Sequence, residues 1–289
     1  MSIRVHIGGR LCPREEAAVP VFDRGFLFGD SVYETVGTSQ GKLVFLDDHL
    51  DRLARSAERL YLRLPPRSEI EQAVQETVAA AANPESRVRI MVTRGDGTAD
   101  LDPAAAGQPR LVVIVQPLGG PPPEAYESGV EVEIVSVTRN SPRAMDPAVK
   151  SGNYLNSVLA LGEARRRRPS AHEAILCAAS GSVAEGATSN VFAVNAGQLR
   201  TPALEVGILD GVTRGKILAL ARANGIPCHE VSFMSPDDLR RADEAFLTSS
   251  VRGVLPVIRV DGLMLGDGKP GAVTRRLMSL YRQMVEAQA

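Results

Sequence analysis

Lys150 stands where an extended run of alternating apolar residues gives way to a helical run, and its amine could form a Schiff base with an aldehyde. The extended run covers residues 130–137, and the helical run begins at Asn153 and continues to about Arg165. A lysine at such a junction is most often a solvated surface charge. A chemical role for Lys150 therefore depends on which other residues accompany it.

Three further segments carry residues that complement a reactive lysine. Glu185 is followed by the small and hydroxyl-bearing run 187–190, and its carboxylate could face a pyridinium nitrogen. The Gly-Val-Thr run 211–213 opens a helical pattern whose first backbone N–H groups could close on a phosphate. Arg52 lies in another helical pattern, and its planar guanidinium suits the oxygens of the same phosphate. Together with Lys150, these are the parts that a pyridoxal phosphate enzyme needs.

The same segments, with Phe-Asp-Arg-Gly-Phe-Leu-Phe-Gly-Asp at residues 22–30, resemble the class IV (fold type IV) pyridoxal phosphate aminotransferases. That family holds branched-chain aminotransferases, D-amino acid aminotransferases, (R)-selective amine transaminases and aminodeoxychorismate lyase. The matching segments run in family order from about residue 20 to residue 275. The resemblance implies a mixed α/β and α+β fold of two domains. The N-terminal α/β domain is expected to be the smaller, and the C-terminal domain to have a barrel-like β core.

The resemblance also implies a role for each matching residue. Lys150 is expected to be catalytic, carrying pyridoxal 5'-phosphate as a Schiff base and moving the substrate proton. The expected cofactor-binding residues are Arg52, Lys150, Tyr154, Glu185, Ser189, Asn190, Leu209, Gly211, Val212, Thr213, Ser249 and Ser250. The expected substrate-binding residues are Tyr33, Ser250 and Val251, and no metal ion is expected.

Substrate choice is divided between two branches of the family. Gly-Asn-Tyr-Leu at residues 152–155 resembles the branched-chain group, whereas the tail at residues 266–271 resembles the D-amino acid group. The D-amino acid enzymes, however, carry an Arg-x-His pair after Thr-Arg-Gly, and here Gly95 is followed by Asp96-Gly97-Thr98. The sequence therefore favours amino transfer between a branched-chain or other aliphatic amino acid and a 2-oxo acid.

Three alternatives to this function remain open. One is a D-amino acid or (R)-amine transaminase on the same scaffold. Another is aminodeoxychorismate lyase, which eliminates pyruvate with the same cofactor. The third is a phosphate-binding module without chemistry, which the joint presence of Lys150 and Glu185 disfavours.

Composition limits the remaining classes of function. The chain has 289 residues, of which 44% are hydrophobic and 23% charged, and this length favours two domains. A formal net charge of −1 provides no basic surface for nucleic acid, and no apolar run reaches membrane-spanning length. Cys12, Cys177 and Cys228 lack metal or disulfide spacing, which indicates a cytoplasmic protein. The family resemblance implies a homodimer.

Turn and capping residues predict where domains and helices begin. The run 119–123, Gly-Gly-Pro-Pro-Pro, is the clearest linker, so domains are expected at 1–118 and 128–289 with an interdomain loop at 119–127. Ser68 with Glu71 predicts a capping box, and Ser235 with Asp238 predicts the start of a short helix. A long strand is expected over residues 129–138.

Overall fold

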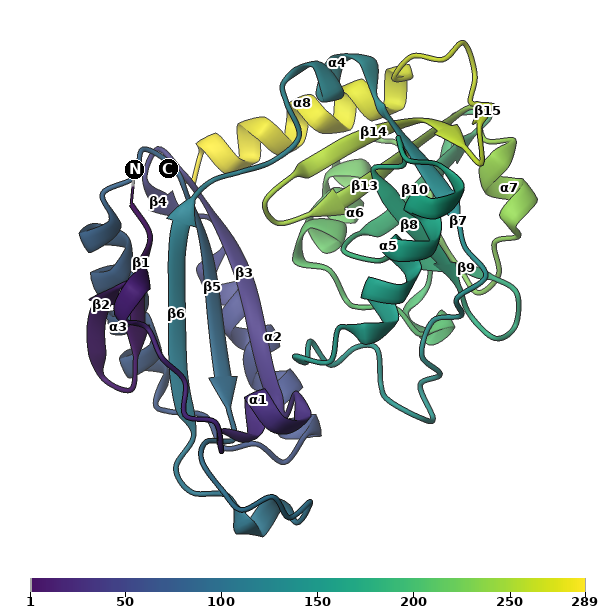
Figure 1. The fold of residues 1–289 in the computed structure, drawn as a ribbon. Helices are drawn as coiled ribbons and strands as arrows, with labels where there is room; N and C mark the ends of the chain where they lie inside the picture. The colour runs from purple at the N-terminus through teal and green to yellow at the C-terminus, as the bar shows by residue number, and fades with distance from the viewer. Residues whose placement is uncertain (1, 289) are drawn as a thin grey trace. The chain divides into compact units, whose positions relative to one another are not determined.

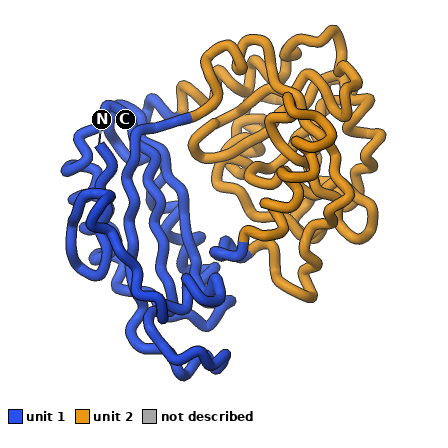
Figure 2. Tube along the Cα trace, in the orientation of Figure 1, with its two compact units in different colours: residues 1–119, 149–153, 285–289 blue, residues 120–148, 154–284 orange. Residues whose placement is uncertain are grey.

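The computed structural model describes residues 2–288, whose helices and strands are drawn in Figure 1. The chain divides into two compact units (Figure 2). The first unit contains Met1–Gly119, Val149–Asn153 and Val285–Ala289, and the second contains Gly120–Ala148 and Tyr154–Met284. Within residues 2–288, no helix combines the length and the apolar character that crossing a membrane requires.

The first unit is built on an antiparallel sheet. In its described residues six strands lie in the order β2-β1-β6-β5-β3-β4. The strands are β1 (Arg4–Ile7), β2 (Arg10–Pro13), β3 (Ser31–Ser39), β4 (Lys42–Leu43), β5 (Ser86–Thr93) and β6 (Arg110–Pro117). The helical segments are η1 (Arg14–Glu16), α1 (Arg24–Phe28), α2 (Leu46–Arg59), α3 (Arg67–Ala81) and η2 (Pro103–Ala105).

Helices α2 and α3 pack on one face of this sheet (Figure 1). In β5 the alternate residues Val88, Ile90 and Val92 are fully buried in the core cluster that also contains residues of both helices. Leu50 and Leu53 of α2 belong to the same cluster, as the three- and four-residue spacing of its apolar positions predicts. The residues that alternate with these along β3 and β5, including Tyr33 and Arg89, point to the opposite face of the sheet.

Helix α3 begins at a different cap from the expected one. The predicted capping box of Ser68 and Glu71 is wrong, because Pro66 is the N-cap residue and makes no side-chain capping bond. Arg67 is already helical, and its Nε atom forms an ion pair with Glu71 at 2.8 Å. The start of α3 is thus set by the fixed φ of proline and by an ion pair one turn apart.

The second unit is built on a mixed sheet. In its described residues nine strands lie in the order β12-β11-β10-β13-β14-β7-β8-β9, with β15 paired to β14. The strands are β7 (Val130–Ile134), β8 (Glu173–Cys177), β9 (Val183–Gly186), β10 (Asn190–Asn195), β11 (Gln198–Pro202), β12 (Cys228–Val231), β13 (Glu244–Ser249), β14 (Gly253–Val260) and β15 (Leu263–Met264). The helical segments are α4 (Glu124–Ser128), α5 (Leu155–Arg167), η3 (Leu204–Val206), α6 (Val212–Ala223), α7 (Pro236–Arg240) and α8 (Ala272–Glu286).

This sheet curls on itself. Strand β9, at one end of the strand order, also contacts β10 and β11, which lie towards the other end. Val191 and Leu247 lie in the core cluster on one face of the β10–β13 pair, and Phe192 and Phe246 stack on the other face with centroids 4.8 Å apart. The curled sheet confirms the expected barrel-like β core.

Of two local predictions for the second unit, the start of α7 is confirmed and the length of the first strand is wrong. Ser235 and Asp238 form the reciprocal capping box that starts α7, as predicted. The strand expected over residues 129–138 is too long, because β7 ends at Ile134. Beyond that residue the Ser136 N–H donates to the Glu163 carboxylate at 2.8 Å, so the backbone leaves the sheet.

The Lys150 segment belongs to the first unit, although the expected domain 128–289 would include it. Its backbone pairs with β3: Val32 forms a β-bridge with Ser151, and the Gly152 N–H donates to the Ser31 carbonyl at 3.0 Å. These contacts group residues 149–153 with the first unit. The expected domain limits and the interdomain loop 119–127 stay predictions.

Candidate active site

The backbone of Lys150 is anchored from two sides within the first unit. The Tyr33 N–H donates to the Lys150 carbonyl at 3.0 Å. The Lys150 N–H donates to Ser56 Oγ on α2 at 3.1 Å. Lys150, which lies outside any helix or strand, is therefore fixed by hydrogen bonds to β3 and α2.

The side chain of Lys150 lies over an aromatic ring. Its Nζ atom is 4.5 Å from the centroid of the Tyr33 ring, and Tyr33 is only 2% exposed. The guanidinium carbon of Arg89 lies 4.1 Å from the same centroid. The face of an aromatic ring attracts cations, so Tyr33 helps to locate both charged groups. The structure thus brings two predicted site residues, Lys150 and Tyr33, together.

Arg89 is not among the predicted site residues. Burial lowers the pKa of its guanidinium, the phenol of Tyr33 opposes this shift, and the charge of Arg87 adds to it. The sequence does hold a signal for Arg89, because a charge stands between the apolar residues Val88 and Ile90 of a strand. Strand alternation sends Arg89 to the face opposite these neighbours, where Tyr33 lies.

Arg52, a predicted phosphate ligand, is paired with a buried carboxylate. Its Nε and Nη2 atoms each donate to Glu34 at 2.7 Å, and His49 Nδ1 lies 2.7 Å from Glu34 Oε2. Burial raises the pKa of Glu34, but the charge and hydrogen bonds of Arg52, with those of His49, lower it overall from 4.5 to about 2. The pair fixes the orientation of the Arg52 guanidinium. Phosphate binding by Arg52 stays a prediction.

Glu185, the predicted partner of a ring nitrogen, accepts hydrogen bonds at both carboxylate oxygens. Arg139 Nε donates to Oε1 at 2.7 Å, and the Leu209 N–H donates to Oε2 at 3.0 Å. Asn190 Nδ2 donates to Oε2 at 3.4 Å. Arg139 is a further residue that the sequence did not reveal, since its partner lies 46 positions away along the chain. These contacts hold the Glu185 carboxylate in one orientation.

The predicted phosphate site lies at the start of α6. Gly211 is the N-cap residue of this helix, and Val212 and Thr213 form its first turn. Asn190 Nδ2 donates to the Leu209 carbonyl at 2.9 Å, which joins β10 to the segment before the helix. A Cβ atom at Gly211 would overlap Asn190 Oδ1, so glycine is what lets the two segments approach. The contact with Asn190 therefore fixes the segment that leads into the helix, and Thr213 in the first turn is 2% exposed.

The β10–β13 pair brings a buried hydroxyl to the same face as Asn190. Thr248 pairs directly with Asn190 in the register of these strands, and directly paired residues send their side chains to one face. Thr248 Oγ1 is buried and has no hydrogen-bond partner among the residues that the structure describes. A buried hydroxyl without a partner, close along the chain to Ser249 and Ser250, fits a bound group with acceptor oxygens such as a phosphate ester.

The predicted site residues fall into two groups, one in each unit. Tyr33, Arg52 and Lys150 belong to the first unit. The second unit contains Tyr154, Glu185, Ser189, Asn190, Leu209, Gly211, Val212, Thr213, Ser249, Ser250 and Val251. Within the second unit, Tyr154 is the N-cap residue of α5. That both groups act on one cofactor stays a prediction.

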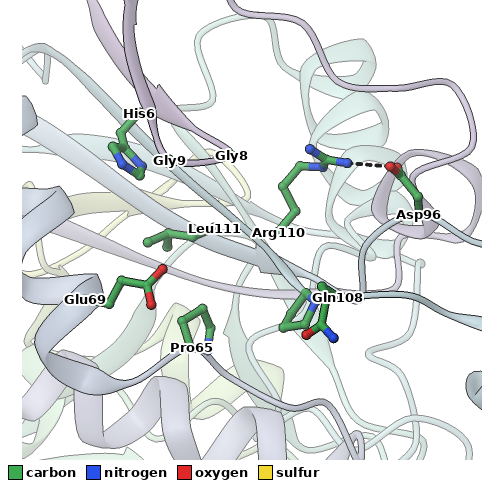
Figure 3. Close-up of a pocket in the computed structure, with 10 residues that line it drawn as sticks. His6, Gly8, Gly9, Pro65, Glu69, Asp96, Gln108, Arg110 and Leu111 are labelled. Carbon is green, nitrogen blue, oxygen red and sulfur yellow. Dashed lines mark hydrogen bonds and ion pairs between the residues drawn. The ribbon is translucent and has the colours of Figure 1, made fainter.

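A separate pocket of about 310 Å³ lies in the first unit (Figure 3). On one side of it Arg110 Nη2 donates to Asp96 Oδ2 at 2.7 Å. The lining residues are His6, Gly8, Gly9, Pro65, Glu69, Asp96, Gln108, Pro109, Arg110 and Leu111. None of these is a predicted site residue, so this pocket is distinct from the Lys150 group.

The sequence is similar to aminotransferases along nearly its whole length. The family model for class IV amino-transferases matches residues 31–260. A Methanocaldococcus jannaschii protein, named provisionally as a branched-chain-amino-acid aminotransferase, is 35% identical over 283 residues, covering 98% of this chain and 96% of that protein. The D-alanine aminotransferase of Bacillus licheniformis is 32% identical over 284 residues, covering 98% of this chain and 97% of that protein.

Solved structures show the same likeness in the fold. The branched-chain aminotransferase of Thermoproteus uzoniensis, crystallised with norvaline, has a TM-score of 0.90 and 33% identity, covering 99% of this chain and 96% of its own. The branched-chain amino acid aminotransferase of Thermobaculum terrenum, crystallised in its PLP-form, has a TM-score of 0.86 and 26% identity, covering 99% of this chain and 94% of its own. Sequence and fold therefore lead to the same group of proteins.

Proposed function

Because the chain belongs to the class IV aminotransferases, enzymes of fold type IV, we propose that it transfers an amino group between an aliphatic amino acid and a 2-oxo acid. The cofactor that this family implies is pyridoxal 5'-phosphate. The observation that carries the proposal is Lys150, whose backbone is bonded on both sides and whose Nζ lies over the Tyr33 ring. A lysine held in this way presents its amine in a defined place.

When bound, pyridoxal 5'-phosphate supplies an aldehyde that condenses with amines and a ring that accepts an electron pair. Lys150 is the amine that we assign to this aldehyde in the resting enzyme. With its amine free, Lys150 Nζ would take the proton from the substrate Cα and later return a proton. General acid–base transfer by a positioned side chain accelerates such steps by about 100- to 10,000-fold.

Glu185 is proposed to hold a proton at the ring nitrogen of the cofactor. Its carboxylate keeps one orientation because Arg139 and the Leu209 N–H bind its two oxygens. A carboxylate fixed in this orientation would keep the ring nitrogen protonated, which the electron-accepting chemistry of the cofactor requires. Arg139 therefore supports the reaction through Glu185 rather than by touching the substrate.

The phosphate is proposed to bind at the start of α6. The backbone N–H groups of Val212 and Thr213 and the positive end of the helix dipole suit an anion. The Thr248 hydroxyl, to which no described residue is bonded, adds a donor, and Arg52 brings a guanidinium already oriented by Glu34. Ser249 and Ser250 complete the proposed set.

Arg89 is proposed to receive the carboxylate of the substrate. It is the cation that shares the Tyr33 ring with Lys150, and Asp96-Gly97-Thr98 stands where D-amino acid aminotransferases carry their Arg-x-His pair. Tyr33 then lies between the group that binds the substrate and the group that moves its proton. Because the named relatives act on branched-chain amino acids or on D-alanine, a panel of substrates decides the handedness.

A homodimer is proposed from an exposed apolar stripe on α5. Leu155, Val158 and Leu159 are 76%, 57% and 61% exposed, and their spacing places them on one helix face. Contiguous apolar side chains at a surface mark interaction sites, and a second copy of the chain is the partner we assign. Light scattering should give twice the chain mass for the wild type. Leu159→Glu should shift the protein to the monomer, whereas an unchanged dimer would exclude this stripe from the interface.

A cytoplasmic location is proposed from the thiols. Cys12, Cys177 and Cys228 are all free cysteines. Free thiols are typical of a reducing compartment, where disulfides are rare.

Lys150→Ala tests the proposed function. The wild type should be yellow and lose its absorbance band with borohydride, and it should convert L-amino acids, D-amino acids or (R)-amines with 2-oxoglutarate or pyruvate. The variant should lose the borohydride-sensitive band and at least about 100-fold in turnover. Lys42→Ala, at an exposed lysine of the same unit, should retain both.

Three outcomes would reject the proposal. Full activity of the Lys150→Ala enzyme would show that Lys150 is not the amine that the reaction requires. Release of pyruvate without an amino acceptor would identify a lyase. A colourless wild-type protein that binds no pyridoxal 5'-phosphate would indicate a phosphate-binding module without chemistry.

A further inference from the structure

Arg252, in the turn between β13 and β14, joins three segments of the second unit. Its Nε atom donates to Ser249 Oγ at 3.0 Å. Its Nη2 atom donates to the Thr188 carbonyl at 3.1 Å and to Thr188 Oγ1 at 2.7 Å. Nη1 and Nη2 also donate to Glu173 Oε2, at 3.3 and 3.2 Å. One guanidinium therefore binds its own turn, the turn after β9 and the start of β8.

Glu173 anchors this set of contacts. It is 1% exposed, and its Oε2 atom also accepts from Thr188 Oγ1 at 2.5 Å and from Ser189 Oγ at 3.2 Å. A carboxylate buried this deeply needs a charged partner and several hydrogen bonds, because it has lost its water. Arg252 provides the partner, and its own side chain is only 13% exposed. Removing either charge would leave the other one buried without a partner.

The segments that Arg252 joins are those that carry predicted site residues. Thr188 and Ser189 follow Glu185, the predicted partner of the ring nitrogen. Ser250 and Val251, predicted to bind the substrate, lie between Ser249 and Arg252. Because both ends of that dipeptide are bonded, at Ser249 Oγ and through the Arg252 side chain, its two backbone N–H groups have little freedom to rotate.

The backbone of Arg252 is fixed as well. The hydroxyl of Tyr126, on α4, donates to the Arg252 carbonyl at 3.0 Å. Burial raises the pKa of this phenol, while the charge of Arg252 opposes the shift, so the hydroxyl keeps its proton and stays a donor. Tyr126 of α4 therefore binds the main chain of Arg252, while Glu173 binds its side chain.

We propose that Arg252 is a positioning residue that keeps the Ser250 and Val251 N–H groups aimed at the substrate by clamping their turn to Thr188 and Glu173. The inference rests on the proposed function, since it concerns how substrate is held in that same site. Arginine is required because its planar fork presents donors to several acceptors at once, which a lysine ammonium cannot do in the same geometry. Arg252 acts through the backbone amides and is not a catalytic residue.

The test compares Arg252→Met and Arg252→Lys with Arg259→Met in the full-length protein. Arg259, on β14, is a matched control because it also forms an ion pair, with Glu131 at 3.4 Å, but lies outside the clamp. The first readout is hydrogen exchange of the backbone amides in residues 187–190 and 249–253, with and without added pyridoxal 5'-phosphate. The second is KM and kcat for the best amino donor found in the substrate panel. Thermal unfolding confirms that each variant is folded.

The proposal predicts a local change and an effect on binding. In Arg252→Met both segments should exchange at least about tenfold faster, since charge-assisted hydrogen bonds are lost, while the rest of the second unit keeps its protection. KM should rise about tenfold with a smaller change in kcat. Arg252→Lys, which keeps the charge, should recover folding stability but only part of the protection and affinity. Arg259→Met should match the wild type in both readouts.

Each contrary result has a separate meaning. Wild-type exchange and KM in Arg252→Lys or Arg252→Met would overturn the clamp. Faster exchange with an unchanged KM would overturn the positioning of substrate while leaving amino transfer intact. If Arg252→Met does not fold, the lysine variant decides by the same two readouts. If the wild type shows no amino transfer at all, the proposed function fails, and hydrogen exchange still reports whether Arg252 orders the turn.

Discussion

The Nζ atom of Lys150 and the ring of Tyr33 are 4.5 Å apart, and this contact depends on how the Lys150 segment pairs with β3. The Tyr33 N–H binds the Lys150 carbonyl, so the same residue positions both the main chain and the amine of the lysine. Arg89 lies over the same ring, so one aromatic side chain contacts two basic groups.

Replacing the Tyr33 ring should therefore harm the enzyme more than removing the hydroxyl. Tyr33→Leu should lower kcat/KM by about tenfold or more, because a cation–π contact in a desolvated site is lost for both Lys150 and Arg89. Tyr33→Phe keeps the ring face and should stay much closer to the wild type. Steady-state kinetics on both variants test this, and equal losses in the two would show that the ring face does not matter.

Glu34→Gln should destabilise the first unit. Arg52 would keep its buried charge and lose its partner, which costs about 3–5 kcal/mol in comparable buried pairs. Urea unfolding at neutral pH measures this loss. Glu131→Gln is the control, because the Glu131 pair with Arg259 is partly exposed and should contribute less than about 1 kcal/mol.

The same carboxylate should make stability depend on acid. The pKa of Glu34 is lowered from 4.5 to about 2 in the folded protein, so its contribution is present above pH 4.5 and disappears as the pH falls towards 2. The shift corresponds to a loss of about 3 kcal/mol over that range. Unfolding measured between pH 6 and pH 2 should show this loss in the wild type and a smaller one in Glu34→Gln. Parallel curves for the two proteins would contradict the assignment.

Glu185→Gln should separate binding of the cofactor from turnover. Glutamine keeps the size of the side chain, but its single carbonyl oxygen can accept from only one of Arg139 and the Leu209 N–H, and it cannot hold a positive ring nitrogen by charge. We expect kcat to fall by about 100-fold or more while the borohydride-sensitive absorbance remains. Glu205→Gln, at an exposed residue of the same unit, should leave kcat unchanged. A kcat equal to that of the wild type in Glu185→Gln would show that Glu185 is not the partner of the ring nitrogen.

Gly211, the N-cap residue of α6, and Gly215, within that helix, should respond in opposite ways to alanine. A methyl group at Gly211 would overlap Asn190 Oδ1 and disturb the segment before the helix, so the Kd for pyridoxal 5'-phosphate should rise by about tenfold or more. At Gly215 an added Cβ meets nothing within 4 Å among the described residues. Gly215→Ala should therefore stabilise the helix by about 0.5–1 kcal/mol and leave the Kd unchanged. Cofactor titration followed by fluorescence distinguishes the two variants, and an equal Kd for both would remove the α6 start from the phosphate site.

Sequence alone was sufficient for features that are local. Lys150, Glu185 and the glycine-led start of α6 could be named as candidate site residues because each is a residue type in a short pattern. The capping box at Ser235 was predictable for the same reason, since its two partners are three positions apart. The ordered set of such patterns along the chain also led to the correct family.

Partners far apart in the chain could not be predicted. Glu34 pairs with Arg52, 18 positions away, and Arg139 pairs with Glu185, 46 positions away. Many arginines and carboxylates in the sequence could have formed such pairs, and side-chain type does not distinguish among them. The choice is made when strands and helices pack and a few of these charges are buried side by side.

The sequence by itself determined which chemical groups this protein carries and in which helices and strands most of them lie. The tertiary structure decided that the Lys150 segment pairs with β3 in the first unit and that Arg89 shares the Tyr33 ring with the lysine. The physical reason is that hydrophobic periodicity specifies which face of an element is buried. It does not specify which distant segment supplies the hydrogen bonds at its edge, because that depends on the register in which the whole sheet closes.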